Sequence, residues 1–289
     1  MKFHYYPGCS LEASAREYGL STRALMQVLG VELTEIPGWT CCGASAAEAV
    51  SELLSLSLAA RNLSLAARAA ADRQILVPCS ACYLNLKRVE RRASDDERLK
   101  ARLNEVLEVE GLALDRTPTP RHLLDVVSRD IGAEPLRENR KRRLDGLRIA
   151  PYYGCQCLRP YRVFDDPEAP RSMEALITAT GAEVYPFAMA ARCCGASHMN
   201  TKTAVGLQLV AAILDDARGA DAVVTVCPMC QMNLEAYQRR VSRVAGRDLA
   251  IPVLYLPQLL GLALGLAPVA LGLDLNLAVP EGFIERVAA

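Results

Sequence analysis

The chain repeats itself once, and cysteines mark the matching points of the repeat. The pentapeptide Cys-Cys-Gly-Ala-Ser occurs at residues 41–45 and again, unchanged, at residues 193–197. In each copy a Gly-Cys pair precedes this pentapeptide and a Cys-x-x-Cys pair follows it. The matching cysteines are Cys9, Cys41, Cys42, Cys79 and Cys82 in the first copy and Cys155, Cys193, Cys194, Cys227 and Cys230 in the second. A repeat of this length predicts two similar halves, each built as one structural unit.

Each half shows the same order of predicted elements. A short apolar strand ends at the Gly-Cys pair, and a helix follows it, over residues 14–29 in the first half. A second strand ends near the Cys-Cys pair, a long helix over residues 45–72 comes next, and a third strand enters Cys-x-x-Cys. Strands that alternate with helices favour a parallel sheet with helical cover. Because sites in open parallel sheets collect beyond the carboxyl ends of the strands, the cysteine groups of each half are expected to meet there.

The predicted fold class is therefore α/β, with two pseudo-symmetric lobes. Each lobe is a short parallel sheet with covering helices and a cysteine cluster at the carboxyl ends of its strands. We place the lobes at residues 1–145 and 146–289, which agrees with a common domain size of roughly 100 to 200 residues. The Arg- and Lys-rich stretch 134–145 is the expected linker. The charged segment 87–111 predicts a solvated helix, with a docking surface for a partner as the alternative.

Composition and charge narrow the possible functions. Hydrophobic residues make up 51% of the chain, which is enough for a folded core. Basic and acidic residues balance at 33 each, so no net charge attracts the chain to nucleic acid or to an anionic membrane. The most apolar stretch, 259–273, is interrupted by glycine and proline and falls short of the ~20 residues of a membrane span, which predicts a buried helix and turn. The N-terminus does not resemble a secretory signal, so we expect cytoplasmic localisation.

Eleven cysteines in a cytoplasmic chain favour metal or redox chemistry over disulfides. Thiolates are soft ligands that suit iron-sulfur clusters, zinc and copper(I). Five thiolates per half are one more than a closed tetrahedral zinc site uses, and adjacent cysteines can reach two irons of one cluster. A thioredoxin-like dithiol would explain Cys-x-x-Cys at a helix N-terminus, but not the other cysteines. The pattern favours iron-sulfur clusters, with zinc and a dithiol as alternatives.

Two further residues near these motifs are interpreted as bystanders. Cys157 has no partner in the first half, where Leu11 takes the matching place, and we interpret it as a packed thiol. His198 follows Gly195 by three residues, and we interpret it as a hydrogen-bonding or surface histidine, because a complete thiolate set lies beside it.

Several motifs around the cysteines resemble a known family. Residues 60–63 read Ala-Arg-Asn-Leu, residues 226–230 read Val-Cys-Pro-Met-Cys, and residues 252–263 read Pro-Val-Leu-Tyr-Leu-Pro-Gln-Leu-Leu-Gly-Leu-Ala. Together with the two Cys-Cys-Gly cores, they make nearly the whole chain resemble the CCG-domain family, specifically the B subunit of heterodisulfide reductase. The resemblance implies two non-cubane [4Fe-4S] clusters, each ligated by five cysteines. The first would take Cys9, Cys41, Cys42, Cys79 and Cys82, and the second Cys155, Cys193, Cys194, Cys227 and Cys230.

The resemblance also implies a function in sulfur metabolism. The two clusters would face one another across a cavity in which a disulfide is split into two thiols. The implied partners are a ferredoxin-like protein (the C subunit of such complexes) and a flavoprotein (the A subunit), and the substrate is a disulfide, a thiol or lipoate-bound sulfur. From the Arg- and Ala-rich composition we prefer the heterodisulfide reductase-like system of sulfur-oxidising microbes. The alternatives are an electron-transfer or membrane-anchoring CCG subunit of a succinate or lactate oxidising complex, and a zinc-binding scaffold protein.

Overall fold

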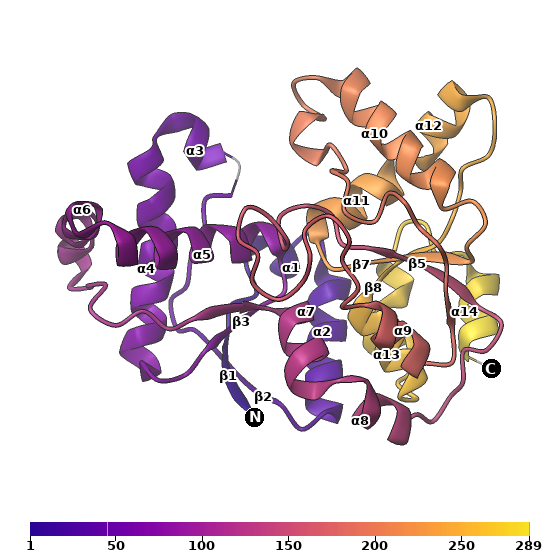
Figure 1. Ribbon diagram of the computed structural model, residues 1–289, viewed down its shortest axis with the longest axis horizontal. Coiled ribbons are helices and arrows are strands. Elements are labelled where there is room, and N and C mark those ends of the chain that lie inside the picture. The colour runs from indigo at the N-terminus through magenta and orange to yellow at the C-terminus, as the bar shows by residue number, and fades with distance from the viewer. Residues whose placement is uncertain (45, 289) are drawn as a thin grey trace.

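The computed structural model describes residues 1–44 and 46–288 and places its strands in two separate sheets. Each sheet has four parallel strands, in the orders β2-β1-β3-β4 and β6-β5-β7-β8, so the two sheets share one topology. Figure 1 shows β1, β2 and β3 in one part of the molecule and β5, β7 and β8 in another. The predicted α/β class with two pseudo-symmetric lobes is confirmed. The strands are β1 (Lys2–Tyr5), β2 (Glu32–Glu35), β3 (Ile75–Val77), β4 (Pro120–His122), β5 (Arg148–Tyr152), β6 (Glu183–Val184), β7 (Ala222–Thr225) and β8 (Val253–Tyr255).

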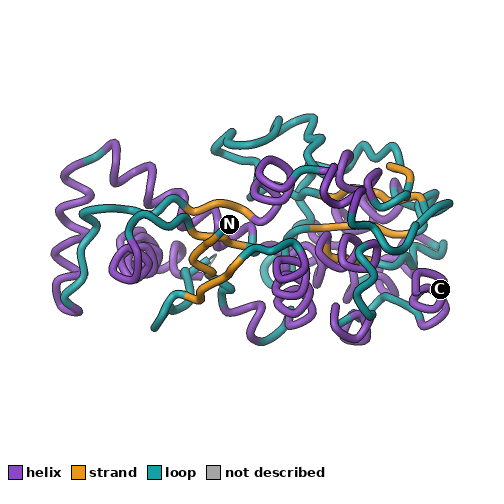
Figure 2. Tube along the Cα trace, turned by 90° about the horizontal axis from the view of Figure 1, so that it is seen from below, coloured by secondary structure: helices purple, strands orange, loops and turns teal. Residues whose placement is uncertain are grey.

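Helices make up most of the regular structure and surround the short strands (Figure 2). The helices are α1 (Cys9–Glu12), α2 (Arg16–Val28), α3 (Ala46–Val50), α4 (Glu52–Ala70), α5 (Ser80–Asp95), α6 (Glu97–Leu107), α7 (Leu123–Asp125), α8 (Ala133–Glu138), α9 (Glu174–Ala179), α10 (Thr203–Asp216), α11 (Pro228–Ala236), α12 (Gln238–Ala245), α13 (Leu256–Ala263) and α14 (Glu281–Ala288). Within the described residues, none of these helices is long and apolar enough to cross a membrane.

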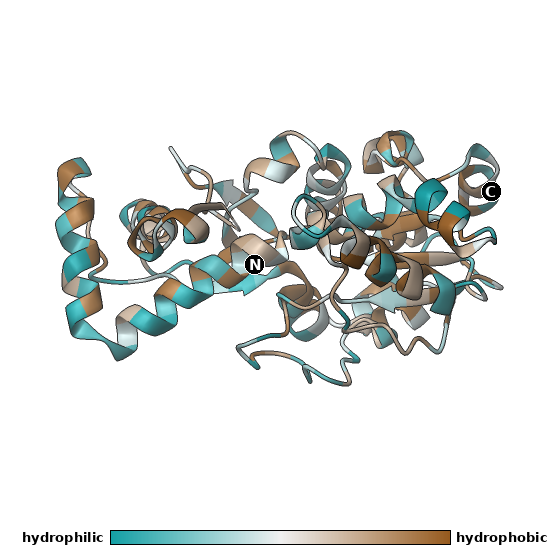
Figure 3. Cartoon of the chain, turned by 90° about the horizontal axis from the view of Figure 1, so that it is seen from above, coloured by the Kyte–Doolittle hydropathy of each residue, from teal (hydrophilic) through white to brown (hydrophobic). Residues whose placement is uncertain are grey.

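The predicted helices are present, and the second of them is divided. The helix expected over 14–29 is α2, preceded by the short α1. The helix expected over 45–72 is α3 and α4, and its predicted first residue, Ser45, lies outside the described residues. The division falls at Ser51, whose side chain accepts a hydrogen bond from the Leu54 N–H and so starts α4. The charged segment 87–111 lies mostly in α5 and α6, whose turns alternate between hydrophilic and hydrophobic residues (Figure 3).

A fourth strand in each half was not predicted. β4 pairs with β3 and β8 pairs with β7, each at one edge of its sheet. Both strands are three residues long, too short to show a periodic pattern. β4 also begins with Pro120. Proline has no backbone N–H to donate, so it normally argues against a strand, but the edge of a sheet tolerates it.

The two halves pack against each other through α2 and α13. The rings of Tyr18 and Tyr255 stack with their centroids 4.0 Å apart. Tyr18 Oη lies 3.0 Å from the Pro78 carbonyl oxygen and 3.1 Å from that of Val226, the residues that precede Cys-x-x-Cys in the two halves. One continuous core contains buried residues of both halves. The two Cys-x-x-Cys segments therefore begin next to each other at this interface.

The expected linker 134–145 follows the first sheet and packs on the second half. Its residues Lys141 and Arg142 donate their backbone N–H groups to the Ala263 carbonyl oxygen. The apolar stretch 259–273 contains the end of α13, which is buried, and a turn at Gly265, so the predicted buried helix and turn is confirmed. The division into lobes at residues 145 and 146 stays a prediction.

Candidate metal centres

Every cysteine group of the repeat lies where a strand ends. In the first half Cys9 follows β1, the Cys41-Cys42 pair follows β2, and Cys79 follows β3. These strands are parallel neighbours, so their carboxyl ends share one edge of the sheet. Strands β5, β6 and β7 place the second set in the same way. The predicted position of the cysteine clusters is confirmed.

The five thiols of the first half contact one another in a chain. Cys9 Sγ lies 3.7 Å from Cys41 Sγ, and Cys42 Sγ lies 3.4 Å from Cys82 Sγ. Side-chain hydrogen bonds also join Cys41 to Cys42 and Cys79 to Cys82. All eleven cysteines are free, and the measured separations far exceed a disulfide bond of about 2.05 Å. Two sulfurs that share a metal at about 2.3 Å lie roughly 3.8 Å apart in a tetrahedral arrangement, close to the separations seen here.

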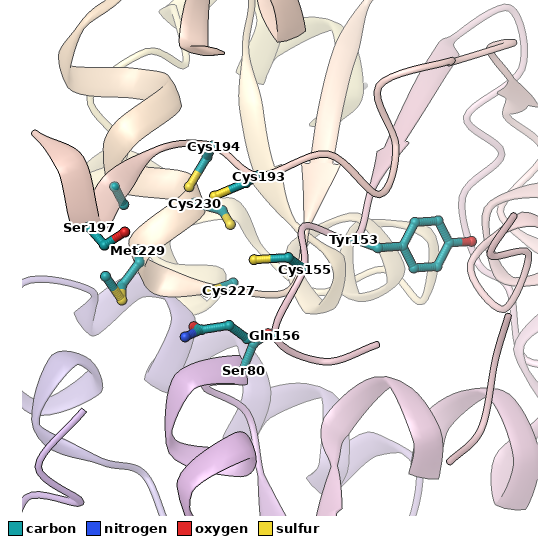
Figure 4. Close-up of a pocket in the computed structure, with 11 residues that line it drawn as sticks. Ser80, Tyr153, Cys155, Gln156, Cys193, Cys194, Ser197, Cys227, Met229 and Cys230 are labelled. Atoms are coloured by element: carbon teal, nitrogen blue, oxygen red, sulfur yellow. The ribbon is translucent and has the colours of Figure 1, made fainter. Parts of the chain in front are cut away.

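The five thiols of the second half line a small hollow of about 60 Å³. In Figure 4 the sulfurs of Cys155, Cys193, Cys194 and Cys230 point toward a common space, with Cys227 beside them. The Tyr153 ring points away from it. The remaining lining residues are Ser80, Gln156, Ala196, Ser197 and Met229. Ser80 is the only one of these residues that comes from the first half.

The packed thiols shift one another's pKa. In the second half the hydrogen bond from Cys155 lowers the pKa of Cys193 to about 6, and the bond from Cys230 lowers that of Cys227 to about 7. In the first half the bonds from Cys41 and Cys82 hold the pKa of Cys42 well below its usual range. Each cluster therefore contains thiols that ionise readily, and the thiolate is the form that binds metal.

The Cys-x-x-Cys pairs open helices, as predicted. Cys79 is the residue before α5 and Cys227 the residue before α11. Backbone N–H groups of Met229 and Cys230 at the start of α11 add to the lowering of the Cys227 pKa. This is the effect expected at the positive end of a helix.

In each half the glycine before the first cysteine of the set leaves room for the sulfur of the last cysteine. Gly8 and Gly154 have φ angles of +74° and +70°, a conformation that L side chains rarely adopt. A Cβ at Gly8 would lie 2.8 Å from Cys82 Sγ, and one at Gly154 would lie 2.9 Å from Cys230 Sγ. The backbone can approach these sulfurs closely only because both residues are glycine.

Tyrosine and asparagine hold the Cys-Cys loops, a role that the sequence did not reveal. Tyr6 Oη donates to the Thr40 carbonyl oxygen at 2.6 Å, and Tyr152 Oη donates to that of Arg192 at 2.7 Å. These carbonyls immediately precede the two Cys-Cys pairs. The available signal was the repetition of Tyr before Gly-Cys at matching places in the two copies.

The asparagines act from the opposite side of the same loops. Asn85 Nδ2, on α5, donates to the Cys42 carbonyl oxygen at 3.0 Å. Asn233 Nδ2, on α11, donates to the Cys194 carbonyl oxygen at 2.6 Å. Each Cys-Cys pair is thus held between a strand end and the Cys-x-x-Cys helix. The Asn-Leu dipeptide repeated after each Cys-x-x-Cys was the signal for this contact.

Cys157 and His198 lie near the second cluster. The Cys157 thiol is buried, donates to the Tyr153 carbonyl oxygen at 3.3 Å and has its pKa raised to about 12 by burial. It is a neutral, packed thiol. His198 ends a short turn after Gly195, is half-buried, and makes a small contribution to the low pKa of Cys193.

The donor set of each half contains more sulfurs than one tetrahedral metal ion uses. Among residues 1–44 and 46–288, no group of three or more His, Cys, Asp or Glu side chains has the arrangement of a metal-ion site. The thiols of the first half run in a chain, which suits a group whose several irons take different sulfurs. Soft sulfur donors in this arrangement fit an iron-sulfur cluster.

A family model matches both copies of the repeat, and a solved structure shares the fold. Residues 3–87 and 149–235 match the CCG family, described as a cysteine-rich domain, so the two matches coincide with the two copies of the repeat. A solved structure, described as a hypothetical protein from Helicobacter pylori, superimposes with a TM-score of 0.75 at 18% identity. The similarity covers 96% of this chain but 52% of that chain, and it concerns the fold.

Curated relatives extend over almost the whole chain. The 8-methylmenaquinol:fumarate reductase membrane anchor subunit of Wolinella succinogenes is 37% identical over 95% of this chain and 96% of its own length. The B subunit of the ferredoxin/F(420)H(2)-dependent CoB-CoM heterodisulfide reductase of Methanosarcina acetivorans is 31% identical, over 99% and 97%. Because the family match covers both copies and these relatives align from end to end, the chain belongs to the cysteine-rich CCG-domain family and is related throughout to the B subunits of heterodisulfide reductases.

Proposed function

We propose that this chain is an iron-sulfur subunit of a larger oxidoreductase complex and carries electrons between its partners. The observation that supports the proposal is the gathering of ten thiols in two sets of five at matching sheet edges. When bound, such clusters supply reversible one-electron transfer. The proposed ligands of two non-cubane [4Fe-4S] clusters are Cys9, Cys41, Cys42, Cys79 and Cys82 for the first and Cys155, Cys193, Cys194, Cys227 and Cys230 for the second.

The surrounding residues have two tasks in this proposal. They fix the sulfurs, because each Cys-Cys pair is held from one side by a partly buried hydrogen bond of tyrosine and from the other by a buried hydrogen bond of asparagine. They also keep water from part of each cluster, since Cys42, Cys79 and Cys82 are buried while Cys9 and Cys41 are exposed. The exposed side of each centre is where an electron would enter or leave.

One observation favours electron transfer as the main function. The relative that is 37% identical is named as the membrane anchor subunit of a fumarate reductase, which agrees with the alternative of a succinate-oxidising type of complex. We therefore propose membership of a fumarate- or succinate-linked complex in the cytoplasm, with a flavoprotein and a ferredoxin-like iron-sulfur protein as partners.

A second candidate is catalysis of S–S bond making or breaking, as in a heterodisulfide reductase-like complex. The hollow supports it, because five thiols of the second half and Ser80 of the first half line one space at the interface. The substrate would be a disulfide, a thiol or lipoate-bound sulfur. The relatives named as B subunits of heterodisulfide reductases agree with this candidate.

The proposal is tested by anaerobic purification followed by iron and acid-labile sulfide analysis. We expect about eight irons and eight sulfides per chain, as two clusters of four irons require. Zinc without iron would overturn it. The two candidates are then separated by EPR of the oxidised and reduced protein with added disulfides. Electron transfer alone leaves the spectra unchanged, whereas a new signal that requires the disulfide identifies S–S chemistry.

A further inference from the structure

The Tyr18 hydroxyl lies between the two Cys-x-x-Cys segments. Its Oη lies 3.0 Å from the Pro78 carbonyl oxygen and 3.1 Å from the Val226 carbonyl oxygen, and it is the donor in both contacts. A phenol has one proton, so the two contacts form one hydrogen bond that is shared between two acceptors. Pro78 is bonded to Cys79, and Val226 is bonded to Cys227. Each acceptor therefore belongs to the peptide group of a proposed cluster ligand.

Ser80 adds a second link between the same two segments. It follows Cys79 directly, is almost fully buried, and donates its hydroxyl to the Val226 carbonyl oxygen at 3.2 Å. The backbone N–H of Leu124 donates to His122 Nδ1, so the hydrogen of the neutral ring is on Nε2, 3.1 Å from Ser80 Oγ. His122 therefore donates to Ser80, and the proton of Ser80 is left to point to the carbonyl of the second half.

Packing fixes the Tyr18 ring in its position. The side chain is fully buried, and its ring stacks on the ring of Tyr255 with 4.0 Å between the centroids and 4° between the planes. Tyr18 is on α2 of the first half, whereas Tyr255 ends β8 of the second half. The hydroxyl is thus held between the two backbones by the same stack that joins the halves.

The second half supplies neither hydroxyl. In the repeat Phe164 stands at the same offset from the first cysteine as Tyr18, and Pro228 matches Ser80. Phe164 also stacks on a ring at the end of the other half's fourth strand, that of His122, with 5° between the planes. Phenylalanine and proline have no hydroxyl to donate. The aromatic packing is therefore repeated, whereas both hydrogen-bonded links come from the first half.

These links give a short bonded path between the two sets of thiols. Along the polypeptide, Cys79 and Cys227 are separated by more than half of the chain. Through Tyr18, the path leaves the peptide group of Cys79, crosses the shared hydrogen bond and enters the peptide group of Cys227. Through Ser80, it crosses one hydrogen bond to the same peptide group. Electronic overlap decays less steeply along bonds and hydrogen bonds than across a gap between side chains, so an electron tunnels more readily along such a path.

We propose that the hydroxyls of Tyr18 and Ser80 link the two centres and that an electron passes from one centre to the other through them. The inference rests on the proposed function, because it concerns the clusters assigned there. One centre loses an electron and the other gains it, while both hydroxyls keep their protons and are neither oxidised nor reduced. The chain then works as a relay between two partners rather than as two separate electron carriers.

The test is pulse radiolysis of the anaerobically purified full chain, whose iron content is measured first. Viologen radicals deliver less than one electron per chain, and the absorbance of the clusters follows that electron. The wild type should show a first-order phase whose rate does not depend on protein concentration, as passage within one molecule requires. Combining Tyr18→Phe with Ser80→Ala should slow this phase several-fold, and each single substitution should slow it less. All three variants should keep their iron, because neither residue is a proposed ligand.

Two controls identify what the first-order phase reports. Tyr5→Phe combined with Ser21→Ala is the matched control, because it removes two buried hydroxyls that do not join the halves. Tyr5 Oη has no hydrogen-bond partner among the described residues, and Ser21 Oγ bonds only to carbonyls of its own helix. This variant should keep the wild-type rate. Cys194→Ser, which lacks a proposed ligand of the second centre, should lack the phase. A redox titration of each variant should find the midpoint potentials in place.

The outcomes separate the two proposals. If the wild type contains no iron and sulfide, the proposed function is overturned. If iron is present but the double variant keeps the wild-type rate, or the matched control slows equally, the inference is overturned while the function stands. The same conclusion follows if the wild type shows no first-order phase, if the phase persists in Cys194→Ser, or if a shifted midpoint accounts for the slowing. If the double variant does not assemble both centres, the single variants decide, and a wild-type rate in both refutes the link.

Discussion

The two halves hold their cysteines in the same way but differ in what surrounds them. Both use a tyrosine at a strand end, an asparagine on the following helix and a glycine beside a sulfur. In the first half Asn62 of α4 also binds both the N–H and the carbonyl of Thr40. The second half leaves its thiols around a hollow that Ser80 of the first half helps to line. The repeat therefore preserves the contacts that position the sulfurs, whereas the residues around each set of thiols, and so the solvent access to them, are specific to each half.

The largest expected effect tests whether each half holds its cluster independently of the other half. Cys42→Ser and Cys194→Ser each remove a buried sulfur that contacts other thiols of one cluster. We expect each variant to lose about half of its iron and one of two EPR signals, because each half holds its own cluster. Cys157→Ser, which removes a packed thiol outside the proposed set, should keep all the iron. Complete iron loss from either single variant would contradict the comparison and would mean that the two centres assemble together.

A smaller effect is expected at the glycines that approach the sulfurs. Gly8→Ala and Gly154→Ala should each lower the free energy of unfolding by about 1–3 kcal/mol, because alanine strains the backbone at a positive φ. Each variant should also lose iron from one half, because the new Cβ meets a sulfur. Gly30→Ala is the matched control, since its φ is also positive, at +68°, but nothing lies within 4 Å of an added Cβ. It should lose stability and keep its iron. Equal iron loss in all three variants would show that strain alone disturbs the centres.

The smallest effect concerns pH and distinguishes two matching positions. Lys87 and Glu235 follow the repeated asparagines by two residues. Lys87 pairs with Glu90 at 2.6 Å, whereas Glu235 accepts hydrogen bonds from the backbone N–H groups of Leu277 and Ala278. Burial is the main cause that raises the pKa of Glu235 from 4.5 to about 7. The second half alone therefore has a carboxyl group at this position that titrates near neutrality.

The sign of this pH dependence follows from proton binding. Between pH 4.5 and about 7, folded Glu235 keeps a proton that the unfolded chain has released, so stability should fall as pH rises through this range and level off above it. Denaturant unfolding at pH 5 to 8 should show this slope in the wild type and a flatter one in Glu235→Gln. Glu281→Gln, an exposed carboxylate of the same half, should keep the wild-type slope. An unchanged slope in Glu235→Gln would remove this difference between the halves.

Much of the fold and of the candidate site could be predicted, and the failures have physical reasons. The ten cysteines and their place at strand ends were predicted because the repeat aligned them and parallel strands share one carboxyl edge. Strands β4 and β8 were missed because three residues show no periodicity. The roles of Asn85 and Asn233 were missed because each bonds to a carbonyl about 40 residues away, and local patterns carry no information about such contacts.

By itself, the sequence determined that the chain has two similar halves, which residues carry the sulfur donors, and that these donors suit iron-sulfur chemistry. These conclusions depend on residue type and order, which the repeat displays directly. Only the tertiary structure decided how the halves meet, and so that Ser80, the residue after Cys79 of the first set, also lines the hollow of the second set. The contact between the halves follows from the burial of α2 against α13, whose apolar surfaces are far apart in the chain. A repeat that makes the two halves look alike does not specify this packing.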